Sequence, residues 1–197
     1  MKELLRRRPL VGALAFQAGV VALALGLIWL FGLQPWRHTE WSLQTLLWSL
    51  VATVPLAAML VALPFYAAQW RWARDITHLI EEFLLPLFHR APAGSVVLVA
   101  ILAGVGEELL FRGVIQYGLA GPMGPMPALI IASLLFGLAH AVSVAYFIIA
   151  SLIGLYLGWI YLQTGNLLIP IIVHALYDWI AIRYYLRRGR GRLAESH

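Results

Sequence analysis

The stretch LVGALAFQAGVVALALGLIWLFGL, Leu10–Leu33, decides the class of fold. Apart from Gln17 and a few glycines, every residue in this stretch is apolar. A helix of about 20 apolar residues, rising 1.5 Å per residue, crosses the hydrocarbon core of a bilayer. The stretch is therefore predicted to be a membrane-spanning helix. The bases before it also resemble the start of a signal peptide, with cleavage near Ala22–Ala24. Because the apolar run continues nine residues past that point, an uncleaved anchor is favoured.

The composition of the whole chain gives the same result. Of its 197 residues, 62% are hydrophobic and only 12% are charged, and the mean hydropathy is +0.84. Soluble domains are nearer ~45–50% apolar and ~25% charged. A soluble enzyme, a disordered regulator and a fibrous protein are all excluded. With no cysteine, the chain has no disulfide, thiolate metal site or site for S-acylation.

Further apolar segments predict five more spans. They are Leu43–Ala68, Ser95–Leu119, Pro127–Ala141, Val144–Leu162 and Leu167–Tyr185. Short connections rich in Gly and Pro separate some of them, and no internal repeat is visible. We expect an all-α membrane protein with about six transmembrane helices. We expect residues 1–197 to form a single membrane domain.

The segment Gln69–Pro92 has a different pattern. Its apolar residues recur in steps of three and four, from Trp72 to Phe88, and charged residues occupy the rest of the helix. This pattern is typical of an amphipathic helix lying in the membrane interface. A cytoplasmic helix packed against the bundle is the alternative.

The basic residues indicate the orientation of the chain. With six spans both termini lie on one side, and twelve of the fourteen Lys and Arg then share that side. They are Lys2, Arg6, Arg7, Arg8, Arg71, Arg74, Arg90, Arg183, Arg187, Arg188, Arg190 and Arg192. Only Arg37 lies outside, and Arg112 lies within a span. By the positive-inside rule both termini are expected in the cytoplasm. The net charge of +5 thus reflects orientation, and no nucleic-acid partner is expected.

Six ionisable residues fall inside predicted spans. They are Glu107, Glu108, Arg112, His140, His174 and Asp178. A charge at the centre of a span costs roughly 2.5–3.5 kcal/mol even on the lenient insertion scale. Several such charges persist only where they pair or meet water, so this set is the candidate functional site within a polar cavity.

The spacing of these residues predicts pairs. Glu108 and Arg112 are four apart and can form an ion pair on one helix face, whereas Glu107 is turned about 100° away. The pair alone favours a structural role. His140 follows Phe136 by four residues, and Asp178 follows His174 by four. A lone intramembrane His is often only a hydrogen-bond donor between helices, and His174–Asp178 could be only a helix-stabilising pair. A purely structural network, however, does not need an additional glutamate beside two histidines.

Three motifs in order resemble one known family. They are Glu107-Glu108-Leu-Leu-Phe-Arg112 (EExxxR), Phe136-Gly-Leu-Ala-His140 (FxxxH) and His174-Ala-Leu-Tyr-Asp178 (HxxxN/D). The chain is similar to the CAAX protease and bacteriocin-processing (CPBP, or Abi) family of intramembrane glutamic endopeptidases. The resemblance covers residues 96–182 as the catalytic core.

The resemblance implies a membrane-helix bundle around a cavity open to the cytoplasm, and an endopeptidase activity. The residue matched by Glu107 activates water, assisted by the one matched by His140. The matches of His174 and Asp178 line the cavity near the substrate carbonyl, and Glu108 and Arg112 support the site. Hydrolysis needs such a base and donors to the developing oxyanion.

Asp178 departs from the Asn that many family members carry. An ionised Asp only accepts hydrogen bonds, whereas Asn also donates. We therefore expect Asp178 to orient His174, as a carboxylate orients a catalytic imidazole.

Alternative functions stay open at this stage. Two His and two Glu could suit zinc, but the HExxH spacing is absent and the resemblance implies no metal or other cofactor. A non-catalytic scaffold or bacteriocin-immunity protein of the same family is the main alternative, and a proton-coupled transporter a weaker one. We expect a substrate peptide with a hydrophobic anchor, and a bacterial cytoplasmic membrane as the location. The oligomeric state is not predicted.

Overall fold

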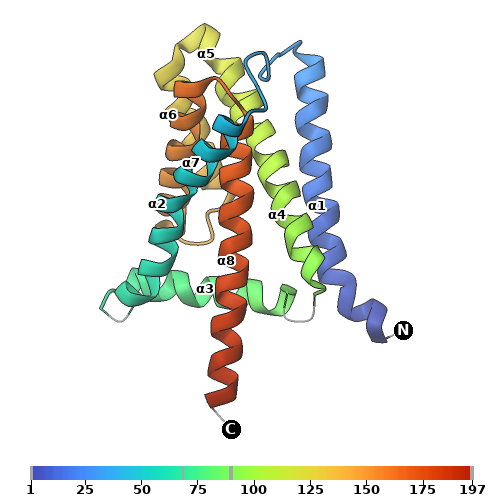
Figure 1. Ribbon diagram of the computed structural model, residues 1–197, viewed down its shortest axis with the longest axis vertical. Coiled ribbons are helices and arrows are strands. Elements are labelled where there is room, and N and C mark those ends of the chain that lie inside the picture. The colour runs from blue at the N-terminus through green and yellow to red at the C-terminus, as the bar shows by residue number, and fades with distance from the viewer. Residues whose placement is uncertain (1, 68, 89–90, 196–197) are drawn as a thin grey trace.

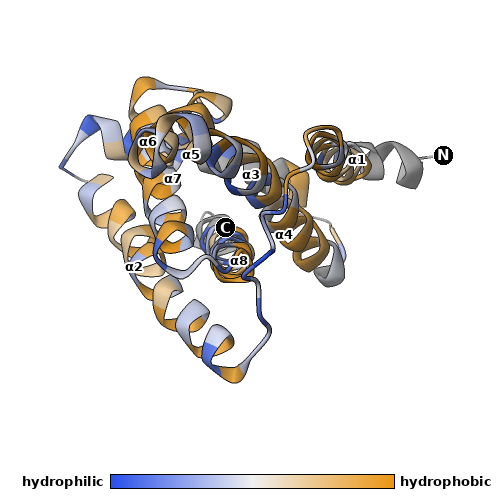
Figure 2. Ribbon diagram, turned by 90° about the horizontal axis from the view of Figure 1, so that it is seen from above, coloured by the Kyte–Doolittle hydropathy of each residue, from blue (hydrophilic) through white to orange (hydrophobic). Residues whose placement is uncertain are grey.

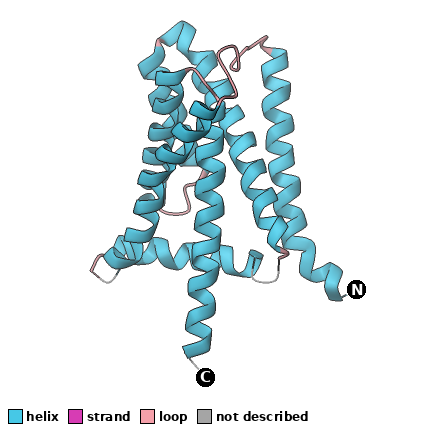
Figure 3. Cartoon of the chain, in the orientation of Figure 1, coloured by secondary structure: helices cyan, strands magenta, loops and turns pink. Residues whose placement is uncertain are grey.

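The computed structural model describes residues 2–67, 69–88 and 91–195, and in these ranges helices are joined by loops with no strand (Figure 3). The elements are α1 (Lys2–Leu30), α2 (Leu43–Ala67), α3 (Arg71–Phe88), α4 (Ala93–Glu108), η1 (Leu109–Gln116), α5 (Tyr117–Met123), α6 (Pro125–Ala139), α7 (Val144–Thr164) and α8 (Leu168–Glu195). Each predicted apolar segment coincides with helical structure to within three residues at its described ends, and Ser95–Leu119 extends over α4, η1 and α5. Residue 68, the predicted end of the second span, is outside the described ranges.

Four stretches are long and apolar enough to cross a membrane. They are Pro9–Leu30, Leu43–Ala67, Gly94–Met123 and Val144–Thr164. The third corresponds to the predicted span Ser95–Leu119 and runs continuously through α4, η1 and α5. The apolar helix α6 is shorter than these four. The structure thus supports an all-helical membrane protein, and a count of six spans stays a prediction.

The last helix, α8, is not among those four stretches although it passes through the centre of the bundle (Figures 1 and 2). It packs against α2, α3, α4 and α7. The reason for its lower hydropathy is that His174, Asp178 and Arg183 lie along its apolar part. Because those neighbours surround α8, its polar residues are shielded from the lipid that the outer helices contact.

Helix α3 lies across one end of the bundle, nearly perpendicular to the upright helices (Figure 1). The beginning of α1 and the end of α8 lie at that same end. This placement agrees with an interfacial helix and with two termini on one side. The side chains of several predicted cytoplasmic bases, Arg6 to Arg8, Arg90, Arg190 and Arg192, lie outside the described residues.

The outward faces of the upright helices are apolar (Figure 2). Phe16 and Trp29 on α1, Val54 on α2 and Leu152 on α7 are each exposed by half or more. So much exposed apolar surface is unstable in water. The surface therefore indicates a lipid bilayer around the helices.

Glycines let two helices approach α4 closely next to the glutamates. A Cβ on Gly104 would lie 2.9 Å from the backbone nitrogen of Ala175 and 2.9 Å from the carbonyl oxygen of Ile171 on α8. A Cβ on Gly106 would lie 3.1 Å from a methyl group of Val21 on α1. Small residues at such positions allow helices in a membrane to pack closely. The contacts bring α8 and α1 to opposite sides of the two glutamates.

Candidate active site

The two adjacent glutamates lie at the end of α4, where the helix changes to the π-helical segment η1. Within η1 the N–H of Tyr117 donates to the carbonyl of Arg112, five residues earlier. Wider turns of this kind are rare and recur at functional sites. Glu108 and Arg112 form the predicted ion pair, with Arg112 Nη1 donating to Glu108 Oε1 at 2.8 Å. Both side chains are fully buried.

Arg112 also joins this segment to α7 and α6. Its Nη2 donates to the carbonyl oxygen of Gly154 at 2.7 Å, and its guanidinium lies 4.9 Å from the centre of the Phe136 ring. One turn further along, Gln116 Nε2 donates to the carbonyl of Gly158 at 2.9 Å. The paired contacts hold η1 against α7, which supports the structural role predicted for Arg112.

His174 is held by Glu108. Its Nδ1 lies 2.7 Å from Glu108 Oε1, the same oxygen that accepts from Arg112. Since that carboxylate is ion-paired and can only accept, Nδ1 of His174 carries the proton. The Nε2 atom of His174 is thereby directed at Glu107 Oε2, 3.9 Å away, and at Asp178 Oδ2, 3.7 Å away. The hydrogen bond to the ring of His174 is therefore made by Glu108, and an orienting role of Asp178 stays a prediction.

The carboxylate of Glu107 has two different environments. Its Oε1 accepts a hydrogen bond from Gln17 Nε2 on α1 at 3.1 Å. Its Oε2 is buried and forms no hydrogen bond with any residue that the structure describes, although it lies 3.5 Å from His140 Nε2. The side chain is 12% exposed. Glu107 thus keeps one oxygen with free lone pairs beside two imidazoles.

His140 lies just beyond the C-terminal end of α6, which ends at Ala139, so the expectation that it belongs to the helix needs a small correction. The backbone leaves the helical conformation at His140, with φ −105° and ψ 8°. Its Nδ1 still lies 2.8 Å from the carbonyl oxygen of Phe136, and the two rings stack with centres 4.5 Å apart. A proton on Nδ1 leaves Nε2 as the atom that faces Glu107. This side chain is 30% exposed, the most open of the group.

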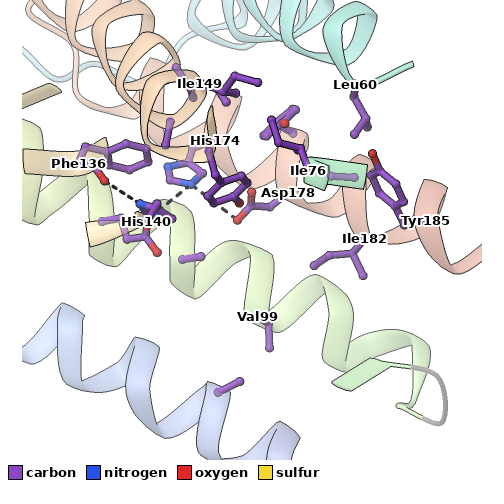
Figure 4. Close-up of a pocket in the computed structure, with 18 of the residues that line it drawn as sticks. Leu60, Ile76, Val99, Phe136, His140, Ile149, His174, Asp178, Ile182 and Tyr185 are labelled. Carbon is purple, nitrogen blue, oxygen red and sulfur yellow. Dashed lines mark hydrogen bonds and ion pairs between the residues drawn. The ribbon is translucent and has the colours of Figure 1, made fainter. Parts of the chain in front are cut away.

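The candidate residues line one cavity of about 330 Å³ inside the bundle. Figure 4 shows His140, His174 and Asp178 together at one end of it, and Ile182 and Tyr185 further along α8. Glu107 and Gln17 lie in its wall, and α3 contributes apolar side chains. Because α3 lies at the end of the bundle where the chain termini are, the cavity extends from the glutamates towards that end.

The structure brings together every site residue predicted from the sequence: Glu107, Glu108, Arg112, Phe136, His140, His174 and Asp178. It adds Gln17, which the sequence presented only as an interruption of an apolar run. The sequence feature that could have identified Gln17 is a single amide side chain in a spanning helix. An unpaired polar group in lipid costs free energy, so such a side chain is expected to have a partner inside the bundle. It also places Tyr146 and Tyr177 in the cavity wall, and no pattern in the sequence indicates them.

Over the described residues, no three or more His, Asp and Glu side chains form a group that could hold a metal ion. Near Glu107, the Oε2 atom has no hydrogen bond with a described residue, and the Nε2 atoms of His140 and His174 lie 3.5 Å and 3.9 Å from it.

Comparisons with known proteins agree with the motifs. Residues 89–180 match the model of the family described as type II CAAX prenyl endopeptidase Rce1-like. The matched range contains all the site residues except Gln17. No curated protein and no solved structure matches the chain.

Proposed function

The match over residues 89–180 supports membership of the chain in the CAAX protease and bacteriocin-processing family, and from this premise we propose that it is a membrane-embedded endopeptidase with Glu107 as its general base. The family implies a protease and therefore a hydrolase. The observation that carries the glutamic mechanism is the uneven environment of the Glu107 carboxylate: one oxygen held by Gln17, the other without a hydrogen bond at the cavity wall.

In the proposed reaction, a water molecule in the cavity gives a proton to Glu107 Oε2 and its oxygen bonds to the scissile carbonyl carbon. His140 assists, because its Nε2 lies 3.5 Å from the same carboxylate oxygen and can accept the second water proton in a hydrogen bond. The two acceptors together direct a lone pair of the water oxygen at the carbonyl. Collapse of the tetrahedral intermediate breaks the C–N bond, and Glu107 returns its proton to the leaving amine.

His174 is the proposed donor to the developing oxyanion. Its ring lies among three carboxyl groups with a single guanidinium in the network, so the imidazolium form offsets negative charge that is otherwise buried without a partner. In that form Nε2–H points into the cavity while Nδ1–H stays on Glu108. A donor fixed in advance at this position stabilises the transition state more than the ground state. Asp178, 3.7 Å from Nε2 and 29% exposed, supports the imidazolium.

An apolar, membrane-anchored peptide is the proposed substrate. The catalytic cavity is lined mostly by apolar side chains. A second cavity of about 680 Å³ lies between α2, α3 and α7 and has an almost wholly apolar lining. Met59, Leu63 and Ile149 line both cavities, so the two adjoin. An apolar chain in the second cavity would place a neighbouring peptide bond beside Glu107. By the positive-inside count, the site faces the cytoplasm.

The test uses purified protein in proteoliposomes and two quenched fluorogenic peptides. One carries a farnesylated cysteine as its anchor, and the other an apolar helix of about 20 residues. We expect Glu107→Gln to abolish cleavage of at least one peptide that the wild type cleaves. Glu40→Gln is the matched control, since Glu40 is exposed in the connection between α1 and α2 at the opposite end of the molecule.

Cleavage that survives Glu107→Gln would refute the mechanism. Loss of cleavage with a chelator, restored by added zinc, would instead favour a metalloenzyme. If the wild-type protein cleaves neither peptide, the proposal of a protease for anchored peptides fails in favour of a non-catalytic role.

A further inference from the structure

Helix α1 lies outside the matched range 89–180 but contributes one side chain to the site. Figures 1 and 2 show α1 at the edge of the bundle beside α4. Only a narrow stripe of its described residues faces inward. Leu10, Ala24 and Ile28 are buried there, the last two one and two turns after Val21. Gln17 lies on the same stripe, one turn before Val21. From Pro9 to Leu30, the rest of the surface of α1 is apolar and mostly exposed.

The position of Gln17 follows from the glycine on α4. Since Gly106 has no side chain, Val21 packs directly against the α4 backbone next to Glu107. One helical turn from Val21, the amide of Gln17 then reaches Glu107 Oε1 at 3.1 Å. The two oxygens of a carboxylate are chemically equal until one of them is bound. The hydrogen bond from the Gln17 amide makes the two oxygens different and leaves Oε2 facing His140 and His174.

We propose that Gln17 is a positioning residue, which fixes the carboxylate of Glu107 so that Oε2 is the oxygen that accepts the proton from water. This inference rests on the proposed function. A neutral amide suits the task, because it donates one hydrogen bond without adding a positive charge beside the base. Without it the Glu107 side chain can rotate, and a small displacement of a reacting group lowers the rate by roughly 10- to 100-fold.

The experiment compares wild type, Gln17→Met, Gln17→His and Gln44→Met in the farnesylated-peptide and apolar-helix assays. Methionine keeps the length of the side chain but not the donor, whereas histidine keeps an N–H. Gln44→Met is the same exchange at an exposed position on α2. We expect Gln17→Met to lower kcat roughly 10- to 100-fold with KM within about twofold, and Gln17→His to retain more of kcat than Gln17→Met.

A thermal melt of the same proteins separates positioning from folding. Replacing an amide with an apolar side chain in a spanning helix should leave the melting temperature unchanged or higher. An unchanged kcat, or a loss of kcat matched by a lower melting temperature, would overturn the inference. Glu107→Gln is measured in parallel: cleavage abolished there but normal in Gln17→Met removes only the role of Gln17, whereas cleavage surviving in both removes the proposed mechanism itself.

Discussion

Replacing Arg112 with methionine tests whether the fully buried ion pair stabilises the fold. Methionine has a similar length but makes neither the 2.8 Å contact with Glu108 nor the 2.7 Å contact with the Gly154 carbonyl. The carboxylate of Glu108 then loses its guanidinium and keeps the ring of His174, whose charge two further carboxyl groups share. Removing one member of such a pair costs about 3–5 kcal/mol, because the remaining charge is uncompensated. At about 2–4 °C per kcal/mol for a chain of this size, the melting temperature should fall by roughly 6–20 °C.

The chain offers a matched control one turn along the same segment. Gln116 donates to the Gly158 carbonyl as Arg112 does to that of Gly154, but it carries no charge. Gln116→Met should therefore cost only about 1 kcal/mol, the net value of one neutral hydrogen bond. Both variants are measured by thermal unfolding in detergent, followed through the loss of the monodisperse peak in size-exclusion chromatography.

A double variant locates the source of the loss. Glu108→Gln combined with Arg112→Met removes both charges and keeps an amide oxygen as acceptor for His174 Nδ1. The double variant should recover at least half of the stability lost by Arg112→Met alone, since no unpaired charge stays buried. The reasoning is refuted if Arg112→Met is no less stable than Gln116→Met, or if the double variant is less stable than the single one.

Two further predictions concern α8. Gly104→Ala places a Cβ 2.9 Å from the α8 backbone, so it should displace α8 and lower kcat by roughly 100-fold. The control is Gly94→Ala, whose added Cβ meets nothing within 4 Å. Equal rates for the two variants would contradict the prediction. Asp178→Asn removes a charge 3.7 Å from His174 Nε2 and should lower kcat roughly tenfold, as a loss of about 1.4 kcal/mol requires. Steady-state rates on the cleaved peptide check it, and a rate equal to or above wild type would disprove the support for the imidazolium.

The helices were predictable because lipid imposes a simple rule on sequence. Any segment without internal polar partners must be apolar for about 20 residues, and α1, α2 and α7 follow that rule. The boundary at His140 was not predictable to one residue, since the end of α6 depends on how the following chain packs. The π-helical segment could not be predicted from the sequence either. Over only eight residues, its periodicity is too close to that of an α-helix to be distinguished from it.

Site membership was predictable, but the partners were not. An ionisable residue in a membrane span is rare because its insertion into lipid costs free energy. Glu107, His174 and Asp178 could therefore be recognised in the sequence as candidate site residues. Spacing could relate only residues on the same helix, and it suggested Asp178 as the partner that orients His174. In the structure His174 makes its hydrogen bond with Glu108, 2.7 Å away on another helix. Such a contact depends on the approach of α4 and α8 at Gly104, which no local pattern encodes.

The two adjacent glutamates have different environments because the helix turns about 100° between them. Glu108 faces the core, where Arg112 and His174 occupy one of its oxygens and no part of the carboxylate meets solvent. A carboxylate so paired is a poor base, since taking a proton would break the ion pair.

One oxygen of each carboxylate lacks a hydrogen bond among the described residues, but only Glu107 lines the cavity, where a neutral amide and two imidazoles surround it. This oxygen of Glu107 can therefore accept a proton from a water molecule. If the two glutamates exchanged environments, the motif would have the same residues but no general base. The proposed catalysis therefore depends on the direction in which each glutamate points, and the close helix contacts at Gly104 and Gly106 set that direction.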